Sequence, residues 1–404
     1  MKQRMRFACR CAGVFAGCLG MLGQLETAFA ADCNALANPV YVAGSTAVKP
    51  FLAKVAGALA AQTPPVTVIY QGQGSCTGVN YMVTSPVGTI TGTGTIWDTS
   101  GAEITGGCTL DLAGNTVDVG VSDVYATSCP SVVALPAGIK DFYGPIQAMT
   151  FAVPVASTRQ SISAEAAYLT LGLGAEGATP WSDMNQVYVR SATSGTQQML
   201  AAAIKVPATK WMGKASSGSG DVVNGLVAAT SADLALGILA TDVVDKNRTK
   251  VRSLAYQHFD QSCGYTPDSD PVTSFDKKNV RDGHYAVWGP LHMLTKVNAG
   301  GVITDAQVKQ VVEYLSLATN VPDVAAIDLI GVEAKGGVVP DCAMRVRRDG
   351  SDMAPMTSYM PQKSCECAFL TAAGAGSANC VACATNATCP ASAPACNYGY
   401  CEVQ

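Results

Sequence analysis

The chain has 404 residues, of which 48% are hydrophobic and 14% are charged, and this composition excludes an intrinsically disordered protein. The length suffices for two or three domains with large cores. The net charge is −4 at pH 7, so the chain as a whole does not attract nucleic acid or anionic lipid, and local groups must attract any anion that it binds.

The first thirty residues have the pattern of an export signal. Four basic residues precede an apolar stretch, and Ala28–Ala30 reads Ala-Phe-Ala, a typical cleavage site. We therefore expect residues 1–30 to be removed as a signal peptide and the mature protein to reach the periplasm or the cell surface. Phe15–Cys18 is a weak lipoprotein motif, which leaves a lipid anchor at Cys18 as an alternative. No later run of about 18 apolar residues predicts a membrane span.

The next part of the chain predicts three strands that each lead to small hydroxyl-bearing residues. These strands, with the residues that follow or end them, are Val40–Ala43 with Ser45 and Thr46, Val66–Tyr70 with Ser75, and 117–123 with Ser122 and Asp123. A helix is expected over 48–59, where the apolar residues lie on one face. Residues 87–116 alternate threonine and glycine with apolar residues, which predicts an inserted β-hairpin held by Cys108.

The second part of the chain continues the alternation of strands and helices. Ile146–Val155 is expected to be a buried strand that crosses into a second lobe, and 281–292 to be the return crossing. A strand over Val187–Val189 ends at Arg190, and a helix begins at Ser194-Gly195-Thr196. The other expected elements are helices at 164–173, 222–227 and 305–318 and a strand at 234–239.

This alternation favours a mainly parallel α/β sheet with helices on both faces, in which ligands bind beyond the carboxyl ends of the strands. Four such ends bear hydroxyl or glycine residues, and one of them has Arg190 beside a helix start. Free N–H groups at a helix start, hydroxyls and a guanidinium together predict an anion site. The alternative is that Ser194, and Ser122 or Asp123, cap helices while Arg190 is solvated.

The four motifs, in this order, resemble those of the periplasmic phosphate-binding protein of bacterial ABC phosphate transporters, a member of the type II periplasmic-binding superfamily. The similarity spans roughly 38–340. It implies an α/β, two-lobe type II periplasmic-binding fold, here with an inserted β-hairpin and a Cys-rich C-terminal extension. The implied division is a first part of lobe I at 31–147, lobe II at 148–286, a return to lobe I at 287–345 and the tail at 346–404.

The resemblance also implies which residues hold the anion. The implied phosphate ligands are Thr46, Ala47, Ser75, Asp123, Arg190, Ser194, Gly195 and Thr196. The Asp123 carboxylate would accept a hydrogen bond from a protonated phosphate oxygen. Sulfate has no proton to donate near neutral pH and would be repelled. Two positions depart from the family pattern. Ala47 replaces an aromatic residue, and Ala192 replaces the acidic residue that would orient Arg190.

Thirteen of the sixteen cysteines follow residue 30, so at least one lacks a partner within the mature chain. Seven lie at 365–401, where few aliphatic residues are present, and we expect them to form disulfides that stabilise the tail. Zinc binding is the alternative, because Cys380-x-x-Cys383 has ligand spacing. Cys263 is expected to be bridged rather than nucleophilic.

The sequence contains no catalytic motif of the G-x-S-x-G, H-E-x-x-H or phosphate-loop type, so we expect a binding protein without enzymatic activity, cofactor or metal. His284 and His292, which bracket Trp288-Gly289-Pro290 of the return crossing, are expected to be structural. The predicted function is the capture of inorganic phosphate for uptake through an ABC permease, without contact with nucleic acid. The alternatives are a cell-surface structural or adhesion protein on the same scaffold, a receptor for another oxyanion and, more remotely, an extracellular phosphate-ester hydrolase.

Overall fold

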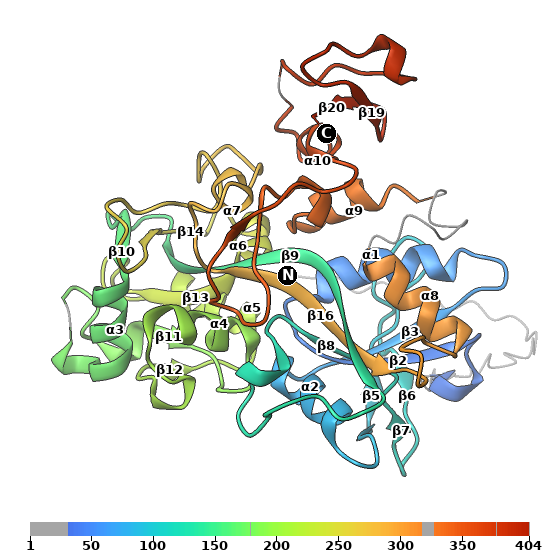
Figure 1. Cartoon of the computed structure of the whole chain (residues 1–404). Coiled ribbons are helices and arrows are strands. Elements are labelled where there is room, and N and C mark those ends of the chain that lie inside the picture. The colour runs from blue at the N-terminus through green and yellow to red at the C-terminus, as the bar shows by residue number, and fades with distance from the viewer. Residues whose placement is uncertain (1–30, 178, 317–326, 377, 404) are drawn as a thin grey trace, which may run out of the picture.

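The computed structural model describes residues 31–177, 179–316, 327–376 and 378–403 (Figure 1). The expected signal peptide and the alternative anchor at Cys18 lie outside these residues. In the part of the chain that the structure describes, no helix is both long and apolar enough to span a membrane.

A nine-stranded sheet runs through the molecule in the order β12-β11-β13-β9-β16-β8-β2-β3, with β14 paired to β9. The strands are β2 (Pro39–Gly44), β3 (Thr67–Gly72), β8 (Val119–Ser122), β9 (Ile139–Pro154), β11 (Val187–Val189), β12 (Lys214–Ala215), β13 (Leu236–Ala240), β14 (Val251–Ser253) and β16 (Trp288–Lys296).

The sheet is mixed, which corrects the expectation of a mainly parallel one. β2 pairs in parallel with β3 and β8, and β11 with β12 and β13, but every ladder of β9 and β16 is antiparallel. The reason is the path of the chain. It passes from one half of the sheet to the other in β9 and returns in β16, so these two long strands run in opposite directions and each is antiparallel to its neighbours.

The crossing strands divide the sheet into two halves. The first part of β9 pairs with β16, and its last six residues pair with β13 and β14. The first half contains β2, β3 and β8, and the second half contains β11 to β14. Figure 1 shows the two halves on opposite sides of the crossing strands.

Helices cover both halves. They are α1 (Lys49–Ala60), α2 (Ser75–Val83), α3 (Ala164–Leu173), α4 (Gly195–Ile204), α5 (Ser219–Val227), α6 (Thr241–Lys246), α7 (Lys278–Arg281), α8 (Ala306–Leu315), α9 (Leu329–Gly336) and α10 (Glu366–Ala372). α1 begins beside a proline and buries the predicted apolar face, which includes Phe51, Leu52 and Val55. These side chains form one core with β2 and α8.

The predicted hairpin insertion is confirmed. β4 (Thr89–Ile90) pairs antiparallel with β7 (Asn115–Thr116), and β5 (Thr93–Gly94) pairs antiparallel with β6 (Cys108–Thr109). β1 (Ala31–Asp32) adds to β6, and a disulfide joins Cys33 to Cys108.

Six disulfides are present among the described residues, and the tail is held together by them as expected. Besides Cys33–Cys108 they are Cys76–Cys129, Cys342–Cys365, Cys367–Cys380, Cys383–Cys396 and Cys389–Cys401. Cys380 and Cys383 belong to different disulfides, so neither offers the thiolate that the zinc alternative requires. Cys263 is a free, exposed thiol, which corrects the expectation that it is bridged, because the other described cysteines pair with one another.

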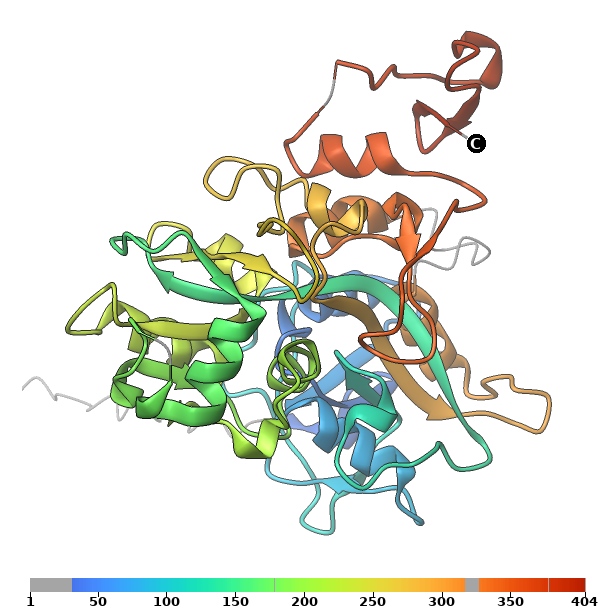
Figure 2. The same cartoon turned by 60° about the vertical axis from the view of Figure 1, so that its left-hand side comes forward.

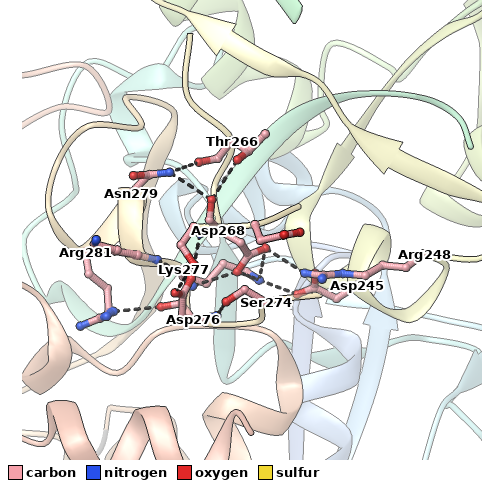
Figure 3. A network of polar contacts seen from close by, with 12 residues as sticks. Asp245, Arg248, Thr266, Asp268, Ser274, Asp276, Lys277, Asn279 and Arg281 are labelled. Carbon is pink, nitrogen blue, oxygen red and sulfur yellow. Dashed lines mark hydrogen bonds and ion pairs between the residues drawn. The ribbon is translucent and has the colours of Figure 1, made fainter. Parts of the chain in front are cut away.

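The C-terminal segment packs over the crossing strands. Figure 2 shows α10 above α9, with the disulfide-linked tail farther from the sheet. α9 packs against α1 in the first half. Glu366 at the start of α10 pairs with Arg281 of α7 at 2.9 Å. α7 follows a buried ion network formed by Lys277 and Arg248 with Asp245 and Asp268 (Figure 3).

Candidate anion-binding site

The strand ends of the first half meet at Asp123, which follows β8 and is 2% exposed. The Ser45 hydroxyl lies 2.6 Å from both carboxylate oxygens and donates to the carboxylate. The Ser75 hydroxyl donates to Oδ2 at 3.0 Å and accepts the backbone N–H of Asp123 at 3.1 Å. β2, β3 and β8 are adjacent in the sheet, so their carboxyl ends bring Ser45, Ser75 and Asp123 together as the sequence predicts.

Two opposing influences act on the Asp123 carboxyl. Burial raises its pKa, because the charged form loses hydration. The hydrogen bonds from Ser45 and Ser75 and the charge of Arg190 lower it, but the net shift is upward. In its ionised form, the buried Asp123 carboxyl accepts hydrogen bonds from Ser45 and Ser75.

Arg190 follows β11 in the second half and reaches across to the first. Its guanidinium donates from Nη1 to the Ser219 hydroxyl at 3.0 Å, and from Nη2 to the Thr46 hydroxyl and the Ser217 carbonyl, each at 3.3 Å. The buried Nε has no partner among the described residues. Arg190 is 4% exposed, so the alternative that it is solvated is wrong. Three of the five guanidinium N–H groups are used in these hydrogen bonds, so two remain for a ligand.

An acidic residue does act on Arg190, although Ala192 does not supply it. Burial lowers the pKa of Arg190, and the negative charges of Asp123 and Asp221 oppose this shift. Asp221 lies in the first turn of α5 and accepts the backbone N–H of Gly218 at 3.2 Å. Asp221 thus acts on Arg190 only through its charge, and Ser217 and Ser219 hold the guanidinium by hydrogen bonds.

The first turn of α4 closes the site from the second half. A Cβ atom on Gly195 would lie 2.2 Å from Ser75 Oγ and 2.7 Å from Asp123 Oδ2, so only glycine permits this approach. Ser194 and Thr196, which flank Gly195, are buried. The Ser194 side chain makes no capping hydrogen bond to α4, so the alternative of a simple capping serine is not observed. The Cys76 N–H donates to the Thr193 carbonyl at 3.0 Å, which joins the two halves directly.

The structure thus places all eight residues implied by the resemblance in one region. The backbone N–H of Ala47 is already bonded to Ser45 Oγ at 3.1 Å. Ser45, Ser217, Ser219 and Asp221 were not among the implied phosphate ligands, although the sequence predicts Ser45 at one of the strand ends of the anion site. Ser45 stands in the first motif, and the other three belong to the Ser/Gly-rich loop and helix start at 213–221. The Ser/Gly-rich composition of that loop is the sequence feature that indicates a place in the site, because it suits a turn that approaches a ligand.

The site offers donors from two helix starts, several hydroxyls and a guanidinium, together with one buried carboxyl acceptor. This combination suits a tetrahedral oxyanion that retains a proton. The histidines lie outside it: His292, for example, contacts Asp141 at 2.7 Å through Nδ1.

No family model and no curated protein matches the sequence. Among solved structures, one described as a phosphate ABC transporter substrate-binding protein with bound phosphate, from Clostridium perfringens, has a TM-score of 0.51 at 14% identity, over 75% of this chain and 99% of that chain. An ABC-type phosphate transport receptor from Vibrio cholerae has a TM-score of 0.47 at 16% identity, over 75% of this chain and 100% of that chain. The reduced OxyR regulatory domain from Pseudomonas aeruginosa has a TM-score of 0.38 at 10% identity, over 68% of this chain and 95% of that chain.

The similarity to the Clostridium structure defines the class of fold. The chain has the two-lobe type II periplasmic-binding fold, with an inserted β-hairpin and a Cys-rich C-terminal extension, as the sequence predicts. At 14% identity the likeness to the Clostridium protein shows the fold alone.

Proposed function

We propose that the protein is an exported, non-enzymatic solute-binding protein that holds inorganic phosphate between its two lobes and delivers it to an ABC permease. The observation that supports this proposal is the buried Asp123 carboxyl beside Arg190 and the first turns of α2 and α4. The Clostridium protein, whose structure contains bound phosphate, supports the same ligand class.

The charges of the site favour a singly or doubly protonated oxyanion. Arg190 and the helix starts attract negative charge, whereas Asp123 repels an oxyanion that has no proton to donate. Phosphate bears such a proton near neutral pH and sulfate does not. An unsatisfied charged acceptor costs more than a neutral one, so an ionised carboxylate facing a sulfate oxygen costs about 1.5 kcal/mol or more, which corresponds to at least about tenfold in affinity.

The proposed lobes are 31–147 with 287–345 and 148–286, followed by the tail. Both lobes supply groups to the site: Thr46, Ser75 and Asp123 come from the first, and Arg190 and Gly195 from the second. A ligand therefore gains its full set of contacts only when the lobes are together, which favours closure on binding.

Titration calorimetry of the mature protein with phosphate and with sulfate tests this proposal. We expect phosphate to bind and sulfate to bind at least about tenfold more weakly. In Asp123→Asn the repulsion disappears, so the preference for phosphate should shrink towards equal affinities while the protein stays folded.

A matched control is Asp233→Asn, which alters a surface carboxylate that accepts hydrogen bonds from the hydroxyls of Ser157 and Thr158. This variant should keep the full preference for phosphate. Absence of heat with both anions, or equal affinities in the unaltered protein, would contradict the phosphate assignment.

A further inference from the structure

A cavity of about 280 Å³ lies between the crossing strands and the C-terminal segment. Its walls include Tyr143 of β9, Trp288 of β16, Glu333 of α9, and Asp341 and Tyr359 farther along the chain. Of the described residues that form the anion site, none belongs to these walls. The cavity is large enough for a small organic molecule.

Glu333 is the least satisfied group in this cavity wall. Its side chain is 0% exposed, and neither carboxylate oxygen has a hydrogen-bond partner among the described residues. Burial raises its pKa well above the ordinary value, and the neighbouring charge of Asp341 adds to the shift. An unpaired buried carboxyl of this kind is costly unless a ligand supplies donors and positive charge.

The two arginines of the wall are only partly engaged. Arg347 pairs with Asp349 of the same wall at 3.4 Å, and its positive charge opposes the effect of burial on the pKa of Asp341. The buried Nε of Arg348 has no hydrogen-bond partner among the described residues. Arg348 donates to the carbonyls of Trp288 at 2.9 Å and Ala286 at 3.0 Å, and its guanidinium lies 4.6 Å from the Trp288 ring centroid.

The cavity thus has more carboxyl than guanidinium groups in its walls. Asp341 is partly satisfied, because the Tyr359 hydroxyl donates to its Oδ2 at 2.5 Å. Glu333 has no such partner among the described residues. Arg347 and Tyr359 thus act on Asp341, whereas Glu333 lacks a partner that a cation with N–H donors would supply.

Trp288 adds a directional group. Its indole Nε1 is buried and has no partner among the described residues, although it belongs to a cavity wall. An indole N–H donates only, so it suits an acceptor oxygen on the same ligand. We propose that this cavity is a second binding site, which takes a small organic amine whose ammonium group pairs with Glu333 and Asp341.

Titration calorimetry of the full mature chain with ethanolamine, putrescine and L-lysine, in the presence of phosphate, tests the proposal. We expect at least one of these amines to bind with one-to-one stoichiometry. Glu333→Gln keeps the size of the side chain but removes its charge, so it should weaken this binding at least about tenfold. The matched control Glu313→Gln alters an acid of α8 that pairs with Lys309 at 3.6 Å and should leave amine binding unchanged.

Asp341→Asn provides a second variant in case Glu333→Gln folds poorly, and it too should weaken amine binding. Phosphate binding should persist in both variants, which separates this site from the anion site. The proposal is overturned if none of the three amines binds, if calcium chloride binds in their place, or if both variants bind the amine as tightly as the unaltered protein.

Discussion

Asp242 is a buried carboxyl at the start of α6 that makes stability depend on pH. It is 1% exposed, its Oδ1 accepts from Gln147 at 3.2 Å, and Oδ2 has no hydrogen-bond partner among the described residues. Burial raises its pKa from 3.8 to about 6, although the charge of Lys246 opposes the shift. The folded state therefore binds the Asp242 proton more tightly than the unfolded state does. Proton binding at Asp242 thus stabilises the folded state fully below pH 3.8, and this contribution is lost as the pH rises through 6.

We therefore expect Asp242→Asn to raise the free energy of unfolding at pH 8 by up to about 3 kcal/mol. The gain should disappear below about pH 4, where the aspartate is protonated in both states. Urea unfolding at the two pH values measures the difference. Glu176→Gln, which alters an exposed acid, should change little at either pH, and an equal gain for Asp242→Asn at both values would contradict the linkage.

The first turn of α4 can lie close to Asp123 only because Gly195 has no side chain. Gly195→Ala would place a Cβ atom 2.2 Å from Ser75 Oγ, so α4 would have to withdraw from Asp123. We expect phosphate affinity to fall at least about tenfold while the thermal midpoint changes little, because the strain is confined to the contact between lobes. In Gly220→Ala of α5, a Cβ would meet nothing within 4 Å, and this control should bind normally. Unchanged affinity in Gly195→Ala would show that α4 does not close the site.

The elements were predictable where local signals suffice. α3 has the bounds 164–173 expected from its spacing, and Ser163 caps it by accepting the N–H of Ala166 at 3.1 Å. The direction of β9 and β16 was not predictable in this way, because it depends on which strands pair across the whole chain. The partners of Arg190 were missed for the same reason: Ser217 and Ser219 follow it by more than twenty residues and meet it only through the pairing of β11 with β12.

On the scale of the whole molecule, the C-terminal segment joins the two halves behind the crossing strands. α9 packs on α1 of the first half. Arg345 pairs with Asp282, which follows α7, and Glu366 pairs with Arg281 of α7 and with Arg345. α7 is held in turn by the ion network of Figure 3, in which Lys277 bonds Asp245 at 2.7 Å and Asp268 at 3.0 Å. A sequence shows charged residues here but not that they are buried together.

Lys277 is 2% exposed, and the two carboxylates raise its pKa against the opposing effect of burial. Lys277→Ala leaves Asp245 and Asp268 with Arg248 as their remaining cation, so we expect the free energy of unfolding to fall by about 3–5 kcal/mol. Hydrogen exchange should quicken in α7 and, because Arg281 holds Glu366, in α10 as well. Lys278→Ala removes an exposed neighbour of the same charge and should have little effect. Faster exchange in α7 without any change in α10 would mean that the tail is held independently of the second half.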